Sequence, residues 1–314
     1  MKTVPKHTRL RGPFAPVVTP FKNDHSVHEA LFVAHCRWLV DKGVGLAIFG
    51  TNSEAASVSL DERIALAEAL VAAGIDPGRL MPGTGLCALP ETVRLTRHAV
   101  ALGARGVLML PPYFYKNLSE EGLFGYYSEV IEQVADDRLA VYLYHIPQMT
   151  QVPITLQLIE RLLKRYPGTI AGAKDSSGDW SNTQAMIDSF AADGFDVFPA
   201  SESMMLQALR IGGAGCISAT NNVNPAMVRE LYDNAASPVA ESLHQAVDAV
   251  RKVFQATAMI PAMKAVLADA HDQPAWRNVR PPLCPIGATD EQALQQKLHA
   301  LNFRLLKNGD TVPA

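Results

Sequence analysis

Short apolar runs alternate with helix-type segments along most of the chain. Eight runs are rich in Val, Ile, Leu and Phe, and successive runs lie roughly 20–35 residues apart. Most are continuously apolar, which is typical of parallel strands covered on both faces. The predicted strands are residues 14–18, 46–49, 80–83, 107–110, 140–144, 170–174, 195–199 and 215–218. Eight such units predict an α/β fold, a (β/α)8 TIM barrel, with a doubly wound sheet of fewer strands as the alternative.

The segments between the runs carry helix boundary signals. Ser59 and Glu62 have the spacing of a capping box, which predicts a helix from residue 60. Pro90 stands where a first helical turn would begin, and Gly103 stands where that helix would end. Ser119, followed by two glutamates, predicts the start of another helix.

Strand signals stop after residue 218. Four helices are predicted beyond this point, over residues 225–232, 242–256, 261–270 and 290–306. No low-complexity segment or long Pro/Gly linker precedes them. We therefore expect a barrel over residues 1–225 and a C-terminal helical extension over residues 226–314 that packs on it.

Composition excludes several classes of protein. Hydrophobic residues make up 48% and charged residues 19%, so the chain is neither disordered nor fibrous. The net charge of −3 and the lack of a basic stripe argue against a nucleic-acid partner. No apolar run approaches the ~18 residues of a membrane span, and the first residues lack a signal-peptide pattern. The four cysteines lie far apart, so we expect free thiols and a cytoplasmic location.

A lysine ends one of the apolar runs, at the end of a strand where barrel enzymes place reactive groups. Lys174 closes the run of residues 170–174. Burial disfavours the charged ammonium and favours a neutral amine that can attack a carbonyl. The alternative is a structural lysine that reaches water or pairs with Asp175.

Two further strand ends carry polar groups. Tyr144 ends the preceding run, so a barrel would make it a neighbour of Lys174, where its phenol could relay protons. An aromatic core side chain is the alternative. The turn from Gly50 to Glu54 follows the second run, and its amides and hydroxyls suit a carboxylate.

These strand ends together resemble a known family. The motifs are Gly50-Thr-Asn-Ser-Glu54, Tyr144-His-Ile-Pro147 and Gly172-Ala-Lys174-Asp, supported by Pro16-Val-Val-Thr-Pro-Phe21, Pro111-Pro-Tyr-Phe-Tyr115 with Glu121-Gly-Leu123, and Gly212-Gly-Ala-Gly-Cys-Ile-Ser218. In this order they are similar to the signatures of the dihydrodipicolinate synthase / N-acetylneuraminate lyase family. The resemblance runs from about residue 11 to 225.

The resemblance implies a class I aldolase or lyase on a (β/α)8 barrel. Lys174 would form a Schiff base with pyruvate or another 2-oxo acid, and a C–C bond would break or form through the enamine. Tyr144 would relay protons. The Thr51 hydroxyl and the amides of Thr51 and Asn52 would hold the substrate carboxylate. No cofactor and no metal are implied.

The resemblance also extends to the assembly. Tyr115, or Phe114 in its place, would reach a neighbouring subunit, and the assembly would be a homotetramer built as a dimer of dimers. Ile217 would place a backbone carbonyl near Lys174. His145 replaces an asparagine of the family, and we favour a packed structural histidine over a substrate contact.

Departures from the family pattern bear on the substrate. Met149 stands where the synthases carry the arginine that grips the semialdehyde carboxylate, and a thioether cannot replace a guanidinium. Asn52 replaces a second threonine, and Asp175-Ser-Ser-Gly178 follows the lysine. These last two features are closer to aldolases of 4-hydroxy-2-oxo acids and 2-oxo-3-deoxy sugar acids than to the lysine-pathway synthase, which is the alternative. Gln148, Met149, Ser176 and residues 220–222 are expected to shape the acceptor pocket.

Three other interpretations compete. Gly83-Thr-Gly85-Leu-Cys-Ala88 satisfies a dinucleotide fingerprint, but the acidic residue expected about 20 positions on is missing, so a Gly-rich barrel loop is favoured. A metal-dependent aldolase would need clustered ligands, whereas the nine histidines are scattered. A silent barrel that senses a 2-oxo acid would be expected to lose Lys174 or Tyr144, and both are present.

Overall fold

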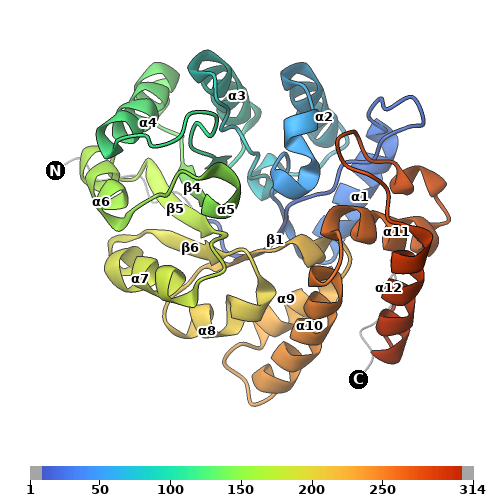
Figure 1. Ribbon diagram of the computed structural model, residues 1–314. Helices are drawn as coiled ribbons and strands as arrows, with labels where there is room; N and C mark the ends of the chain where they lie inside the picture. The colour runs from blue at the N-terminus through green and yellow to red at the C-terminus, as the bar shows by residue number, and fades with distance from the viewer. Residues whose placement is uncertain (1–8, 306–314) are drawn as a thin grey trace. The chain divides into compact units, whose positions relative to one another are not determined.

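The computed structural model describes residues 9–305, in which parallel strands alternate with helices (Figure 1). The described residues form two compact units. The first comprises residues 9–12 and 74–216, and the second comprises residues 13–73 and 217–305. Strands β1 (Gly12–Ala15) and β7 (Gly215–Ile217) each include residues of both units.

The first unit is built on a four-stranded parallel sheet. Its order is β3 (Val107–Met109), β4 (Val141–His145), β5 (Ile170–Asp175) and β6 (Asp196–Pro199). Its helices are α3 (Leu89–Leu102), α4 (Glu120–Val134), α5 (Pro147–Thr150), α6 (Leu156–Arg165), α7 (Trp180–Phe190) and α8 (Met205–Arg210). Figure 1 shows α4, α6 and α7 on one side of β4, β5 and β6, the arrangement that parallel strands require of their connections.

Local signals explain where these helices begin and end. Helix α3 has a proline in its first turn and ends at Gly103, whose φ of 94° is left-handed. The hydroxyl of Ser119 accepts a hydrogen bond from Gly122 N at 3.1 Å and caps α4. Helix α6 buries Leu158, Ile159 and Leu162, whose spacing puts them on one face of the helix, and this face packs on the sheet. The boundary signals predicted at Gly103 and Ser119 are confirmed.

The strand predicted over residues 80–83 is wrong in its extent. Residues 80–83 form no continuous strand: Leu80 and Gly83 are isolated bridge residues. Gly83 pairs with Leu108, and the flanking hydrogen bonds run from Leu108 N to Pro82 O and from Thr84 N to Leu108 O. Pro82 has no N–H and cannot donate to a ladder, so the pairing does not extend into a strand.

The second unit combines β1 and β2 (Gly45–Leu46) with most of the remaining helices. The two strands are parallel and pair Phe14 with Gly45 and Ala15 with Leu46. The helices are α1 (Glu29–Asp41), α2 (Leu60–Ala72), α9 (Pro225–Asp233), α10 (Ala240–Gln255), α11 (Met259–His271) and α12 (Ala288–Ala300). Helix α2 opens with the predicted capping box, in which Ser59 and Glu62 exchange backbone-to-side-chain hydrogen bonds.

Two predicted boundaries in this unit are corrected. The first two strands end earlier than expected, because Pro16 follows β1 and Phe49 adopts a φ of 62° after β2. Helix α12 ends at Ala300 and not at residue 306, since Asn302 is left-handed with a φ of 52°. Residue 306 lies outside the described residues. Between residues 9 and 305, no helix is long and apolar enough to cross a membrane.

Candidate active site

Lys174 lies in the buried sheet of the first unit, one residue before the end of β5. Only 2% of its surface is exposed, so its ammonium does not reach solvent. The register of β4 and β5 pairs Tyr144 directly with Lys174. The Lys174 Nζ atom donates a hydrogen bond to the Tyr144 hydroxyl at 3.2 Å and lies 4.3 Å from the centroid of its ring. The structure therefore brings together the two residues that the strand ends singled out.

Asp175 is hydrogen-bonded to the loop that follows β5 and to the first turn of α7. Its carboxylate accepts hydrogen bonds from the Thr183 hydroxyl at 2.6 Å, from Asn182 Nδ2 at 3.0 Å and from Ser177 N at 2.9 Å. In the described part of the chain no ion pair joins it to Lys174, because successive residues of a strand point to opposite faces. The alternative of a lysine that pairs with Asp175 or reaches water is therefore not what the structure contains.

His145 is a packed residue. It is buried, and its Nδ1 atom accepts a hydrogen bond from Ile154 N at 3.0 Å. Burial lowers the pKa of the imidazole, and the nearby Asp175 carboxylate opposes part of this change. A neutral ring whose Nδ1 accepts carries its proton on Nε2. These contacts favour the structural role over a substrate contact.

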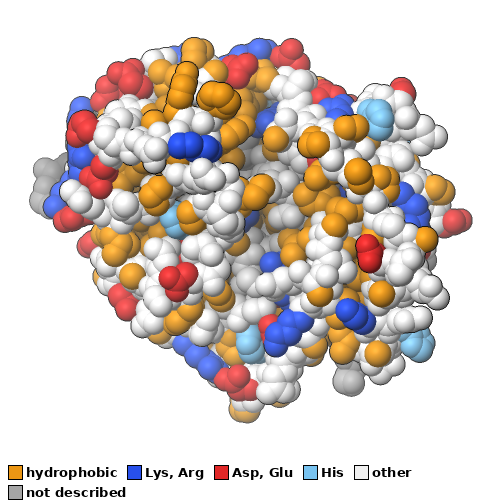
Figure 2. Space-filling model, in the orientation of Figure 1, with side chains coloured by type: hydrophobic (Ala, Val, Ile, Leu, Met, Phe, Trp, Pro, Cys, Tyr) orange, Lys and Arg blue, Asp and Glu red, His pale blue; other side chains and the backbone are white. Residues whose placement is uncertain are grey.

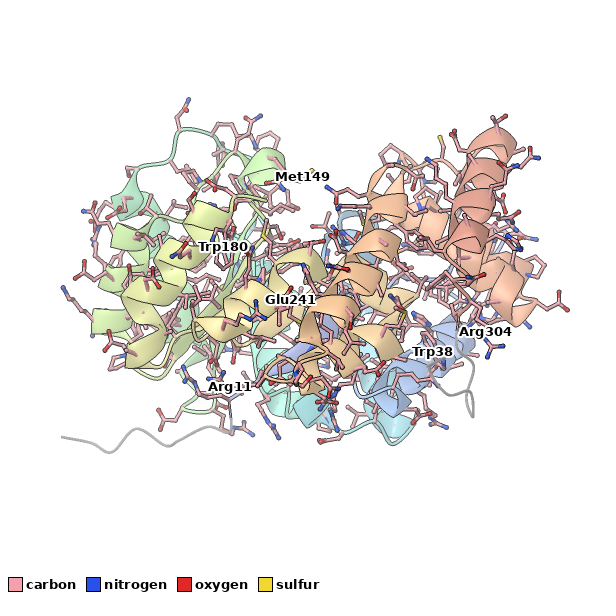
Figure 3. The ribbon with its side chains drawn as sticks, turned by 90° about the horizontal axis from the view of Figure 1, so that it is seen from below. Arg11, Trp38, Met149, Trp180, Glu241 and Arg304 are labelled. Carbon is pink, nitrogen blue, oxygen red and sulfur yellow. The ribbon has the colours of Figure 1, made fainter. Side chains whose placement is uncertain are left out.

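The connections that follow β4 and β5 are joined to each other. Ser176 N donates to His145 O at 2.7 Å and extends the ladder by one bond. Gln148 Nε2 donates to Ser176 O at 2.6 Å and links the one-turn helix α5 to the end of β5. Met149 is 64% exposed, and its side chain projects beyond the ribbon of α5 (Figure 3). Met149 and Ser176 thus lie on adjoining connections at the end of the sheet that holds Lys174.

Tyr115 lies in the connection between β3 and α4 and is not part of this buried cluster. It is 71% exposed and packs edge-to-face on Phe114, which is 73% exposed, with ring centroids 5.5 Å apart. Figure 2 shows a group of hydrophobic side chains standing out from the surface over α3 and α4. Lys116 Nζ donates to Thr150 O at 2.9 Å and ties this connection to α5.

Thr51, Asn52 and Ile217 belong to the second unit. Thr51 and Asn52 are half-buried in a 3-10 helix, Thr51–Ser53, that follows β2. Gly50 N donates to the Ser53 hydroxyl at 3.2 Å, and Thr19 Oγ1 donates to Ser53 O at 2.7 Å. These two hydrogen bonds fix the end of the turn. Ile217 is fully buried at the end of β7. That these three residues face Lys174 stays a prediction.

The glycine pattern that suggested a dinucleotide has a packing explanation. A Cβ atom added at Gly85 would lie 2.2 Å from Leu110 N and 2.4 Å from Leu110 O. The glycine is therefore required by a close backbone approach, and no phosphate is needed to explain it. Among residues 9–305, no group of three or more His, Cys, Asp or Glu side chains is placed to hold a metal ion.

Residues 9–301 match the model of the dihydrodipicolinate synthetase family. The chain belongs to this family. A curated relative, an uncharacterized DapA-like lyase of Chloroflexus aurantiacus, is 34% identical over 291 residues, which are 91% of this chain and 95% of the relative. A 4-hydroxy-tetrahydrodipicolinate synthase of Thermus thermophilus is 33% identical over 303 residues, 91% of this chain and 95% of that protein.

Solved structures of the dihydrodipicolinate synthetase family have the same fold. The dihydrodipicolinate synthase of Agrobacterium tumefaciens superimposes with a TM-score of 0.85 and 29% identity, covering 92% of this chain and 99% of that one. YagE, a prophage protein of E. coli K12 solved in complex with pyruvate, gives a TM-score of 0.82 and 27% identity over 93% and 98% of the two chains. The predictions of a (β/α)8 barrel with a C-terminal helical extension and of a class I aldolase or lyase of this family are confirmed.

Proposed function

We propose that this enzyme makes or breaks a C–C bond between pyruvate and an aldehyde through a Schiff base on Lys174. The buried contact between Lys174 Nζ and the Tyr144 hydroxyl, at 3.2 Å, carries the proposal. A lysine held in an apolar strand loses less hydration when its amine attacks a carbonyl than an exposed lysine would. The Tyr144 phenol beside it can donate and accept protons as the carbinolamine forms and breaks down at Lys174.

The steps for a 4-hydroxy-2-oxo acid balance with these two groups. The Lys174 amine adds to the C2 carbonyl, and a proton from Tyr144 lets the carbinolamine oxygen leave as water. The iminium then accepts the electrons of the C3–C4 bond, while the 4-hydroxyl gives its proton to the Tyr144 phenolate and the aldehyde departs. The Tyr144 hydroxyl returns this proton to C3 of the enamine, and water then hydrolyses the imine, which releases pyruvate and restores the amine. Condensation is the reverse sequence.

Further residues complete the proposed site. Thr51 and Asn52 hold the 2-oxo acid carboxylate through the Thr51 hydroxyl and the backbone amides of the turn. Ile217 supplies a carbonyl near Lys174. Met149 and Ser176 line the acceptor side, which their position on the connections after β4 and β5 supports.

Trapping with pyruvate tests the proposal. Borohydride added to the enzyme and pyruvate should leave a reduced adduct on Lys174, found by mass spectrometry of the digested chain. Lys174→Ala should abolish the adduct, and Tyr144→Phe should slow its formation by about 100-fold or more, the lower range for a positioned acid–base group. Lys164→Ala, which removes a lysine exposed on α6, is the matched control. A folded wild-type enzyme that gives no adduct would refute the Schiff base.

The second candidate function is synthesis of 4-hydroxy-tetrahydrodipicolinate from pyruvate and aspartate semialdehyde. The name of the Thermus thermophilus relative favours it, and Met149 in place of an arginine opposes it. Pyruvate release or consumption should be compared for 4-hydroxy-2-oxo acids, 2-oxo-3-deoxy sugar acids and pyruvate with the semialdehyde. Met149→Arg should increase turnover of the semialdehyde if the residue sets acceptor choice. An adduct without turnover of any of these substrates would instead favour a 2-oxo acid sensor.

Assembly and location complete the proposal. We infer a homotetramer, a dimer of dimers in which Tyr115 or Phe114 reaches a neighbouring subunit, and the exposure of both rings supports this. Light scattering after size exclusion should give four times the chain mass. We also infer a barrel over residues 1–225 with an extension over residues 226–314, and a cytoplasmic location, which the four free cysteines support.

A further inference from the structure

Glu54 follows the Thr51–Ser53 turn in an unusual backbone conformation. Its φ is 55°, in the left-handed region that side chains other than glycine adopt at a cost. Its backbone N–H donates to Thr51 O at 3.1 Å and so closes the turn. Its side chain is fully buried, although a carboxylate loses much of its hydration when it is removed from water. The strained backbone and the buried charge at one position indicate that surrounding contacts hold Glu54 in place.

Those contacts come from helix α11 and from the connection that precedes α12, in the same unit. Glu54 Oε1 pairs with the ammonium of Lys264, a fully buried residue of α11. Glu54 Oε2 accepts a hydrogen bond from Arg280 N at 3.0 Å. Lys264 Nζ also donates to Asn278 O at 2.7 Å and lies 4.6 Å from the centroid of the Phe21 ring. Both carboxylate oxygens and the ammonium are therefore satisfied without water.

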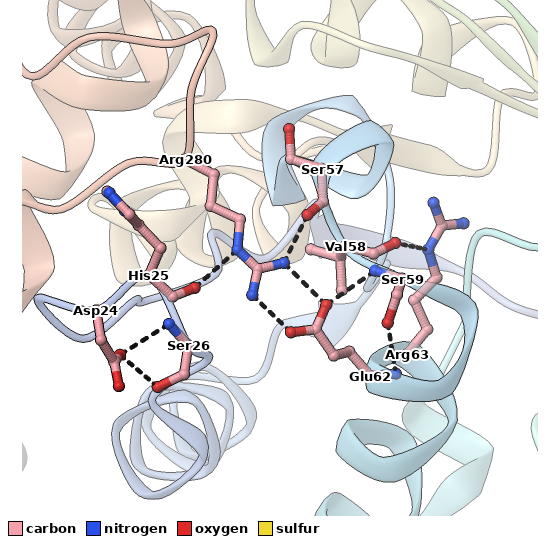
Figure 4. Close-up of polar contacts among 9 residues, drawn as sticks. All are labelled: Asp24, His25, Ser26, Ser57, Val58, Ser59, Glu62, Arg63 and Arg280. Carbon is pink, nitrogen blue, oxygen red and sulfur yellow. Dashed lines mark hydrogen bonds and ion pairs between the residues drawn. The ribbon is translucent and has the colours of Figure 1, made fainter.

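A second anchor holds the far end of the same segment (Figure 4). The guanidinium of Arg280 donates from Nη1 to Ser57 O at 2.6 Å and to Glu62 Oε2 at 2.8 Å, and from Nη2 to Glu62 Oε1 at 2.5 Å. Its Nε atom donates to His25 O at 2.8 Å. The segment from Glu54 to Glu62 is thus fixed at both ends by residues of the C-terminal part of the unit.

Stability alone does not account for this arrangement. A buried ion pair contributes little net stability, because desolvation of both charges offsets their attraction, and an apolar pair of similar volume is often as stable. A conformation that the pair secures explains it better than stability does. That conformation is the left-handed Glu54 that ends the turn of Thr51 and Asn52, the residues proposed to hold the substrate carboxylate.

We propose that Glu54 and Lys264 are positioning residues that fix the Thr51–Ser53 turn for binding of the 2-oxo acid carboxylate. Arg280 supports them from the other end of the segment. The inference rests on the proposed function, since it assigns the turn to pyruvate. Because the turn binds the carboxylate equally in the ground state and in the transition state, loss of the pair should weaken pyruvate binding far more than it slows the later chemistry.

The test measures the pyruvate concentration that gives half-maximal borohydride adduct on Lys174, together with the thermal unfolding midpoint. Glu54→Gln alone leaves the Lys264 ammonium buried without its counter-charge, so the main variant is the double substitution Glu54→Gln with Lys264→Met, which removes both charges. A second variant, Glu54→Asp, keeps both charges but shortens the reach by one methylene. Glu291→Gln is the matched control, because it breaks another ion pair of the C-terminal part of the unit, with Arg277, and leaves the contacts of Glu54 and Lys264 unchanged.

We expect the double variant to unfold near the wild-type temperature, to need at least ten-fold more pyruvate and to reach the wild-type maximal adduct. Glu54→Asp should need at least three-fold more pyruvate, and Glu291→Gln should not differ from wild type. Folded variants that keep the wild-type half-saturating concentration would overturn the positioning role while leaving the Schiff base intact. Absence of the adduct in wild type would instead overturn the proposed function, so the two failures are distinguishable.

Discussion

Asp196 provides a sharp test of the electrostatics of the first unit. It begins β6, is 2% exposed and pairs with Arg9 Nε at 3.3 Å and with Arg11 Nη2 at 3.5 Å. Burial raises the pKa of its carboxyl from 3.8 to about 6, and the two arginines offset only part of this effect. Between these pH values the folded chain binds more protons than the unfolded chain. This carboxyl therefore lowers the free energy of unfolding as the pH rises through that range, and keeps it lowered above about pH 6.

The size of the effect follows from the same values. The interval from 3.8 to about 6, at about 1.36 kcal/mol for each pH unit, corresponds to at most about 3 kcal/mol at neutral pH. Asp196→Asn keeps the shape of the side chain and removes the ionisation. We expect the free energy of unfolding of the variant to exceed that of wild type by up to this amount at pH 8. The difference should shrink toward zero as the pH falls through 3.8, because the wild-type carboxyl then becomes protonated in both states.

Urea unfolding at pH 4, 6 and 8 measures the difference. The matched control is Asp136→Asn. Hydrogen bonds from Arg138 hold the pKa of Asp136 at about 2, so this carboxylate stabilises the fold above its ordinary pKa and the contribution is lost as the pH falls toward 2. The control should unfold more easily than wild type at pH 8, the opposite sign. An Asp196→Asn variant that is less stable than wild type at pH 8 would refute the reasoning, because the arginine pairs would then outweigh burial.

Two further predictions concern packing and charge. Gly85→Ala should lower the free energy of unfolding by about 3 kcal/mol, because the added Cβ would overlap the Leu110 backbone. Gly125→Ala, in open space within α4, should raise the free energy of unfolding by up to about 1 kcal/mol. Equal urea midpoints for the two variants would contradict the packing argument. Arg280 lowers the pKa of Glu62 to about 2, so Glu62→Gln should lower the urea midpoint of unfolding at neutral pH. The difference in midpoint between the variant and wild type should vanish as the pH falls from 4.5 toward 2. A difference that does not depend on pH would exclude the ionic explanation.

The pairing of Lys174 with Tyr144 was predictable from the sequence because parallel strands place their ends side by side. Lys174 and Tyr144 each close an apolar run, and the order of the runs makes their strands neighbours. Helix boundaries at Ser59 and Ser119 were predictable for a similar reason, since capping depends on residues three or four positions apart. In each case the deciding interaction is local, or follows from strand order alone.

The features that were not predicted depend on distant contacts or on one backbone group. Glu54 and Lys264 are 210 residues apart, and a charged residue without a visible partner gives no sequence signal of burial. The run of residues 80–83 is as apolar as its neighbours, yet the missing N–H of Pro82 limits its pairing to isolated bridges. The end of α12 at Ala300 depends on the left-handed Asn302, which periodicity does not indicate.

The placement of Lys174 and Tyr144 on one ladder has a consequence for how this enzyme can change. Backbone hydrogen bonds between β4 and β5 set the spacing of the two side chains, whereas the residues proposed to meet the acceptor lie on the connections after these strands. We therefore expect mutations in residues 146–151 or 176–179 to change the aldehyde while leaving the proposed imine formation intact. On this proposal the choice of aldehyde is a module separate from the chemistry, and grafting these connections between relatives is the direct route to altered specificity.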